Sequence, residues 1–195
     1  SLTPDRARAF LHEAPFPVQA IVPVAPFGGP VDVRGWDLLS EETGIPVIID
    51  AAAGFDSIRV GRSPSVVSFH ATKAFGIGEG GGVFSSDTNL TREIYKLANF
   101  GLYKSRIATV SGMNAKLSEY ASAVGMAAAD EWPSRRARFL EFARCYIEGA
   151  EGQFEFQPGF GDVATATAVV WDDSIEANAL ASVLGAAGIE TLRWW

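Results

Sequence analysis

The chain has 195 residues, of which 48% are hydrophobic, 20% charged and 11% aromatic, and it contains one cysteine, Cys145. This apolar content excludes intrinsic disorder, and the lone cysteine excludes a disulfide scaffold or a multi-cysteine metal site. A formal net charge of −7, with no apolar run near the roughly 20 residues of a membrane span, predicts a soluble, cytoplasmic protein that binds neither nucleic acid nor a membrane.

The first fifty residues alternate between helical and extended patterns. Thr3 as N-cap and Pro4 at the first helical position predict the first helix. Apolar runs over 20–24 and 46–50 predict two strands, and the helical spacing over 31–43 between them makes this a βαβ unit. Because almost every position in both runs is apolar, we expect a parallel sheet that is buried on both faces.

The rest of the chain contains five further strand patterns and three helical patterns. The strands are expected at 65–70, 82–86, 154–157, 165–171 and, as the beginning of a last one, 188–192. The helices are expected at 88–98, 117–146 and 174–187. Within the longest tract, Pro133 should end one helix and begin another, and Arg135, Arg136 and Arg138 favour a solvent-exposed helix face. The pattern changes past Gly149, so we expect one unit over 1–148 and a smaller α+β unit over 149–195.

Two side chains follow strands in positions that suit chemistry. Asp50 ends the strand over 46–50, and ligands of open α/β sheets bind beyond the carboxyl ends of strands. Lys73 follows the strand over 65–70 in a segment with little other charge, where a desolvated lysine can act as an imine-forming nucleophile or a general base. Taken singly, an aspartate that caps the next turn and a lysine on an exposed loop explain the two positions at least as well.

Other patterns argue against further kinds of site. The glycine run over 76–82 matches GxGxxG, but it leads into a strand rather than a helix, which favours a hairpin over a dinucleotide site. His12 and His70 have no second ligand at a metal-binding spacing, so we expect no metal site. Ser68 lacks the GxSxG context of a serine hydrolase. A nucleotide-binding oxidoreductase therefore rests on the glycine run alone.

Four short motifs follow one another along the chain. They are Ile49-Asp-Ala-Ala52, Ser68-Phe-His-Ala-Thr-Lys73, Gly80-Gly-Gly-Val83 and Gly112-Met-Asn-Ala-Lys116. In order and spacing over 17–146, they resemble the DegT/DnrJ/EryC1/StrS family of sugar aminotransferases, which use pyridoxal phosphate and have fold type I. The resemblance implies an α/β fold: a partial three-layer sandwich like the large domain of pyridoxal-phosphate-dependent transferases, followed by part of a small α+β domain.

The resemblance also implies a role for each motif residue. Lys73 would form the internal aldimine with pyridoxal phosphate and then move a proton as base and acid, while Asp50 would keep the ring nitrogen protonated. Ser68 would donate to the phosphate. Asn114 would reach the phosphate of the neighbouring subunit's cofactor, which implies a homodimer. The amino donor would be glutamate, and the acceptor a keto group on a nucleotide-linked sugar.

Three departures from the family pattern bear on activity. Ala53 stands where the family has a glutamine that contacts the cofactor's ring hydroxyl, and Lys116 replaces an arginine and loses its planar fork. Family members are much longer, so we expect this chain to be an internal piece without the N-terminal phosphate loop and with only part of the small domain. The alternative is a catalytically incompetent fragment or paralogue that serves as a dimeric scaffold with the same fold.

Overall fold

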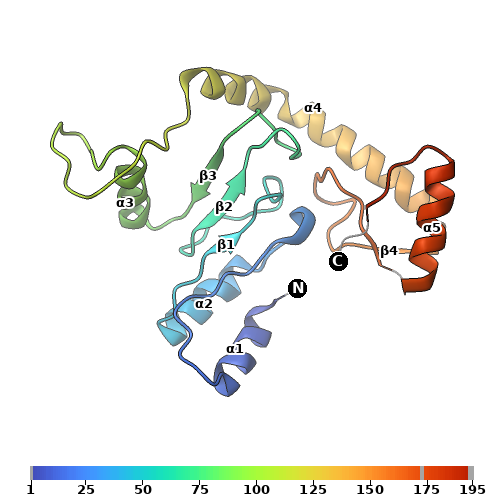
Figure 1. Cartoon of the computed structure of the whole chain (residues 1–195), viewed down its shortest axis with the longest axis horizontal. Coiled ribbons are helices and arrows are strands. Elements are labelled where there is room, and N and C mark those ends of the chain that lie inside the picture. Colours follow the sequence, from blue (N-terminus) through green and yellow to red (C-terminus); the bar gives the residue numbers. More distant parts are fainter. Residues whose placement is uncertain (1, 172–173, 193–195) are drawn as a thin grey trace.

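Helices and two small sheets are joined by long loops in the computed structural model, which describes residues 2–171 and 174–192. The helical elements are α1 (Pro4–Glu13), the 3₁₀ turn η1 (Pro26–Gly28), α2 (Val33–Thr43), α3 (Thr88–Ala98), α4 (Glu119–Gly149) and α5 (Ser174–Ala186). The strands are β1 (Ile49–Asp50), β2 (Ser65–Ser68), β3 (Gly81–Phe84), β4 (Glu155–Phe156) and β5 (Val170–Trp171). Figure 1 shows β1, β2 and β3 in the middle, with α3 and α5 on opposite sides and α4 running across from one side to the other.

The three-stranded sheet is mixed and has the order β1-β2-β3. β1 pairs with β2 in parallel, with Asp50 opposite Val66, and β3 pairs with β2 in antiparallel fashion. The segment predicted as the first strand adds two single parallel contacts, Ile21 with Val47 and Val24 with Asp50. The parallel βαβ unit is therefore confirmed, and so is the hairpin at the glycine run, since β3 turns back onto β2.

Local sequence signals account for the ends of α1 and α2. Thr3 Oγ1 accepts a hydrogen bond from the N–H of Arg6 at 3.3 Å, and the Asp32 carboxylate accepts one from the N–H of Gly35 at 2.9 Å, as N-cap side chains do. α2 ends at Gly44, whose φ of 69° lies in the left-handed region that glycine adopts without strain. These signals explain why both helices form where the sequence predicts them.

The helices α1 and α2 cover one face of the sheet, and the main core lies between them and the strands. Trp36 and Leu39 of α2 are buried in one cluster with Ile49 of β1 and Val67 of β2. Removing each side chain of this size from water contributes roughly 1.5–3 kcal/mol to folding. This layer fixes the position of the two parallel strands.

The opposite face of the sheet is open, which corrects the prediction that both faces are buried. The exposed fraction is 50% for Val24 and 41% for both Ile48 and Val66, and Val22 and Val83 are exposed as well. Residues alternate between faces along a strand. These side chains therefore lie on the open face, and their neighbours along the strands point to the covered face. The apolar runs correctly indicate strands, but burial also needs a covering layer, and α1 and α2 both lie on the other face.

The long helix α4 runs unbroken through Pro133, which corrects the prediction of two helices. Proline removes one backbone hydrogen bond from a helix, but here the residues on both sides of it are held to the same loop. Trp132 packs edge-on against Phe55, with ring centroids 4.9 Å apart. Arg136 binds Asp56, the next residue of that loop. These two contacts keep the halves of α4 in line.

A buried carboxylate ties the C-terminal part of the chain to the loop after β1. The Asp56 side chain is only 7% exposed, and it accepts hydrogen bonds from Arg136 Nε and from the N–H of Ala164, both at 2.8 Å. Arg135 donates to the carbonyl of Ala74 at 3.3 Å. Arg135 and Arg136 are half-buried by these contacts, so the predicted solvent-exposed helix face is found in full only at Arg138, which is exposed.

The strands β4 and β5 form a separate two-stranded antiparallel sheet. They lie within the segments predicted at 154–157 and 165–171 but are shorter. Residues 188–192 form no strand, because a strand needs a hydrogen-bonding neighbour and none of the described strands pairs with this segment; 193–195 lie outside the described residues. Over the ranges that the structure describes, no helix combines the length and apolar character needed to cross a membrane.

Candidate functional site

Two predicted site residues lie at the carboxyl ends of neighbouring strands. Asp50 ends β1 and Ser68 ends β2, and the two strands are adjacent and parallel. Asp50 lies on the open face of the sheet, on the same side as Ile48, because Ile49 between them faces the core. Ser68 lies on the open face for the same reason, since Val67 before it is buried. The carboxylate and the hydroxyl therefore share one edge and one face.

Backbone hydrogen bonds join these two strand ends. The N–H of Ser68 donates to the carbonyl of Ala52 at 3.2 Å, and the N–H of Ala52 donates to Asp50 Oδ1 at 3.0 Å. One carboxylate oxygen of Asp50 is thus fixed, whereas Oδ2 has no hydrogen-bond partner within the described part of the chain. A carboxylate held in this way can accept a further hydrogen bond from a ligand.

Lys73 lies in a tight turn that begins at Ser68. The N–H of His70 donates to Ser68 Oγ at 3.2 Å, and the N–H of Lys73 donates to the carbonyl of His70 at 2.9 Å. A Cβ at Gly76 would lie 2.7 Å from the carbonyl oxygen of Ala71, so the turn can close this tightly only over glycine. Lys73 is half-buried and forms no ion pair with any residue that the structure describes. The turn keeps Lys73 near the carboxyl end of β2.

Asn114 lies apart from the other three predicted residues. It pairs in antiparallel fashion with Asn99, just after α3, and it is exposed. The N–H of Met113 donates to the carbonyl of Leu97 at 2.7 Å, which holds this loop against the end of α3. In Figure 1 the loop and α3 lie together at the left, beyond β3. One chain therefore brings Asp50, Ser68 and Lys73 to one end of the sheet but leaves Asn114 elsewhere.

The ring of His70 has contacts that the sequence reasoning missed. Its Nδ1 lies 2.9 Å from Thr72 Oγ1, and its Nε2 lies 3.6 Å from Glu79 Oε1. The position of His70 inside the motif, between Ser68 and Lys73, was the signal that could have drawn attention to it.

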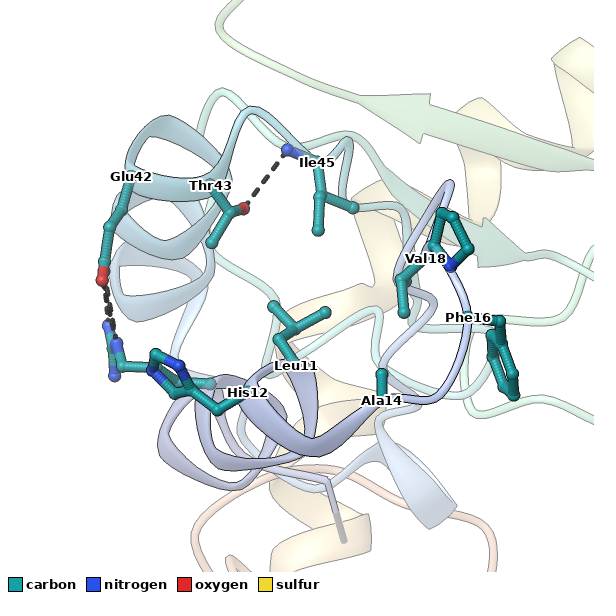
Figure 2. A pocket seen from close by; sticks show the side chains of 10 residues that line it. Leu11, His12, Ala14, Phe16, Val18, Glu42, Thr43 and Ile45 are labelled. Carbon is teal, nitrogen blue, oxygen red and sulfur yellow. Dashed lines mark hydrogen bonds and ion pairs between the residues drawn. The ribbon is translucent and has the colours of Figure 1, made fainter.

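A surface hollow of about 340 Å³ lies at the other end of the sheet, between α1 and α2. Figure 2 shows Leu11 and Ile45 turned toward its middle and Glu42 at its edge. Glu42 forms an ion pair with Arg8 of α1. The hydrogen bond and the charge of Arg8 lower the pKa of Glu42. Because Ile45 precedes β1, this hollow lies at the amino ends of the strands and is not part of the candidate site.

The donor set at the carboxyl ends suits a particular kind of ligand. It combines a carboxylate oxygen open to a further hydrogen bond, a hydroxyl whose oxygen already accepts and whose hydrogen can be donated, and a primary amine. Such a set fits an organic cofactor that carries a protonated ring nitrogen, a phosphate and an aldehyde. Across the described ranges, no three His, Cys, Asp or Glu side chains gather so that they could hold a metal ion.

Comparisons with known proteins found one matching family and several relatives. The model of the DegT/DnrJ/EryC1/StrS aminotransferase family matches residues 1–194. A protein of Mycobacterium tuberculosis is 36% identical over 160 residues, which are 77% of this chain and 39% of that protein. The dTDP-3-amino-3,4,6-trideoxy-alpha-D-glucose transaminase of Streptomyces venezuelae is 32% identical over 190 residues, which are 89% of this chain and 48% of the transaminase.

Solved structures share the fold. A putative PLP-dependent aminotransferase from Bacillus cereus matches with a TM-score of 0.78 and 27% sequence identity, over 95% of this chain and 54% of the other. The fold is thus α/β with a partial sheet, like about half of such a structure. The chain spans 39% and 48% of the length of the two curated relatives above, so it corresponds to less than half of each.

Proposed function

Because the chain belongs to the DegT/DnrJ/EryC1/StrS aminotransferase family, we propose that it is the lysine-bearing part of a cytoplasmic, pyridoxal-phosphate-dependent aminotransferase. Its substrate would be a keto group on a nucleotide-linked sugar, and its amino donor glutamate. The observation that carries the proposal is the arrangement at the ends of β1 and β2, where Asp50 and Ser68 share one face and the turn with Lys73 follows directly. The transaminase from Streptomyces venezuelae, with its sugar-derived name, supports the substrate class.

Each side chain of this site has a separate role in the proposed reaction. Pyridoxal phosphate, when bound, supplies an electron-accepting ring that stabilises negative charge on the carbon beside the amino group. Asp50 would hold a proton at the ring nitrogen through Oδ2, since Ala52 occupies Oδ1. Ser68 would donate its hydroxyl hydrogen to the phosphate, since its oxygen accepts from His70. Lys73 Nζ would bind the aldehyde carbon with loss of water, and once the amino donor had displaced it, the freed amine would carry a proton as base and acid.

A homodimer is part of the proposal, because Asn114 pairs with Asn99 beside α3, apart from the ends of β1 and β2 that carry the other three predicted residues. Asn114 is exposed, and so are the apolar side chains of Ile107, Met113 and Tyr120 in and beside its loop. Apolar side chains in this number around one polar residue suit contact with a second copy. In such a dimer each Asn114 would reach the phosphate at the other subunit's site.

Covalent labelling tests the proposal on the 195-residue chain. Pyridoxal phosphate is added, and borohydride then reduces any carbon–nitrogen double bond to a stable single bond. Peptide mapping should find the label on Lys73, and the chain has only three other lysines, Lys96, Lys104 and Lys116. Lys73→Ala should abolish the label, whereas Lys104→Ala, a matched change on an exposed loop, should leave it in place. Equal labelling of all four lysines would overturn the assignment of Lys73.

A dimeric scaffold without catalysis is the second candidate, and Ala53 favours it. The methyl group of Ala53 offers no hydrogen bond in the turn after Asp50, and Gly28 passes close by, since a Cβ there would lie 2.6 Å from the Ala53 carbonyl oxygen. Glutamate should change the absorbance of the cofactor-loaded chain if it is an aminotransferase. A dimer that holds unreduced pyridoxal phosphate at Lys73 but shows no absorbance change with glutamate would favour the scaffold.

A further inference from the structure

His70 links the two site residues on either side of it. Its backbone N–H donates to Ser68 Oγ at 3.2 Å, and its carbonyl accepts from the N–H of Lys73 at 2.9 Å. The ring then turns back onto the same segment, where the N–H of Thr72 donates to Nδ1 at 3.3 Å and Thr72 Oγ1 lies 2.9 Å from Nδ1. One residue therefore contacts the start, the middle and the end of the turn.

These contacts define which ring nitrogen carries the proton. A backbone N–H can only donate, so Nδ1 must present its lone pair to Thr72. In the neutral ring the proton then sits on Nε2. Nε2 lies 3.6 Å from Glu79 Oε1, in the connection between β2 and β3, so the proton faces a carboxylate. The two contacts with Thr72 therefore set the tautomer, and the carboxylate of Glu79 favours the same one by its charge.

We propose that His70 is a positioning residue for the turn that carries Ser68 and Lys73, acting through the acceptor at Nδ1. The neutral ring holds Thr72 in place, and this keeps the Ser68 hydroxyl and the Lys73 amine in fixed relation to each other. Its importance for catalysis rests on the proposed function, in which Lys73 binds pyridoxal phosphate. The hydrogen bond that Nδ1 accepts from Thr72 holds the turn, and Nε2 has only a supporting role.

Two substitutions of similar size separate the ring nitrogens. In His70→Asn the amide lies near the position of Nδ1 and can offer its oxygen to Thr72, whereas in His70→Gln the amide lies near the position of Nε2. Three measurements are made on the full chain: amide hydrogen exchange at Thr72 and Lys73 without cofactor, the dissociation constant for pyridoxal phosphate with labelling of Lys73, and the ¹⁵N chemical shifts of the His70 ring.

The asparagine variant should behave like the wild type within about twofold. The glutamine variant should show about three- to tenfold faster exchange at Thr72 and a similar rise in the dissociation constant, as the loss of one net hydrogen bond implies. A proton on Nδ1 in the wild type, or equal exchange in the two variants, would overturn the proposal.

Failure of the proposed function would look different. If the wild type binds no pyridoxal phosphate at Lys73 but exchange follows the expected order, the aminotransferase proposal fails and the positioning of the turn stands. If both variants bind and label as the wild type does, the assignment of Lys73 as the cofactor-binding lysine stands and His70 has no positioning role.

Discussion

On one face of the sheet Ile49 and Val67 lie buried with residues of α2, whereas on the other face their strand neighbours Ile48 and Val66 are each 41% exposed. All four side chains are apolar and of similar size. The difference therefore comes from what packs over each face rather than from the strands themselves. α1 and α2 cover one face only, and α4 packs instead against the loops beyond the strand ends.

The open face is also the face that carries the candidate chemistry. Asp50 continues the row of Ile48, and Ser68 continues the row of Val66, so both rows end in polar groups at the carboxyl edge. Fold stability and the candidate site are thus assigned to opposite faces of the same two strands. Substitutions can test whether this division holds, because neighbouring residues of one type lie in the two environments.

The largest difference is expected in α2, where Leu38 and Leu39 are consecutive. Leu39 is fully buried and Leu38 is 53% exposed. Leu39→Ala should lower the free energy of unfolding by about 3–5 kcal/mol, since it removes buried methyl groups and leaves a cavity. Leu38→Ala should cost under about 1 kcal/mol. Urea unfolding of the 195-residue chain measures both, and similar costs would show that α2 does not present one face to the core.

A smaller difference is expected in β2, between Val66 and Val67. Val67 is 1% exposed, so Val67→Ala should cost about 2 kcal/mol. Val66→Ala should cost under about 1 kcal/mol, mainly through weaker strand propensity. The same unfolding experiment is repeated at several protein concentrations. Equal costs that appear only at high concentration would mean that self-association covers the open face in solution.

Local signals were sufficient to predict where α1 and α2 form. Thr3 and Gly44 mark helix ends through contacts within a few residues, and such contacts can be inferred from spacing alone. Asp50 could be placed for a similar reason, because it ends an apolar run and ligands of such sheets bind beyond the carboxyl ends of strands. The end of β2 at Ser68 was not predicted, since the strand was expected to continue to position 70. The motif order then indicated the kind of ligand.

Features that depend on distant partners could not be predicted. Pro133 reads as a helix break until Trp132 and Arg136 are seen to hold both sides of it against Phe55 and Asp56, which are far away in the sequence. The open face was missed because an apolar run shows that burial is favourable but not whether a layer is there to provide it.

The smallest effect on stability is expected from the ion pair that joins α1 to α2. Arg8 of α1 binds Glu42 of α2 at 2.9 Å and lowers the pKa of Glu42 below its ordinary value, chiefly through the hydrogen bond. A lowered pKa in the folded state means that the ionised carboxylate stabilises the fold. This contribution is therefore present above the ordinary pKa of glutamate, about 4.3, and is lost as the pH falls through the folded-state value.

Glu42→Gln should thus lower the urea midpoint of unfolding slightly at pH 7. At pH 3 the variant and the wild type should have the same midpoint. Added salt should also narrow the gap between the two midpoints at pH 7, because the pair is exposed and screened. Glu41 is the matched control, since it is the preceding residue of α2 and forms no ion pair within the described ranges. Glu41→Gln should leave the midpoint almost unchanged at both pH values. A gap for Glu42→Gln that persists at pH 3 would mean that shape, rather than charge, joins α1 to the covered face.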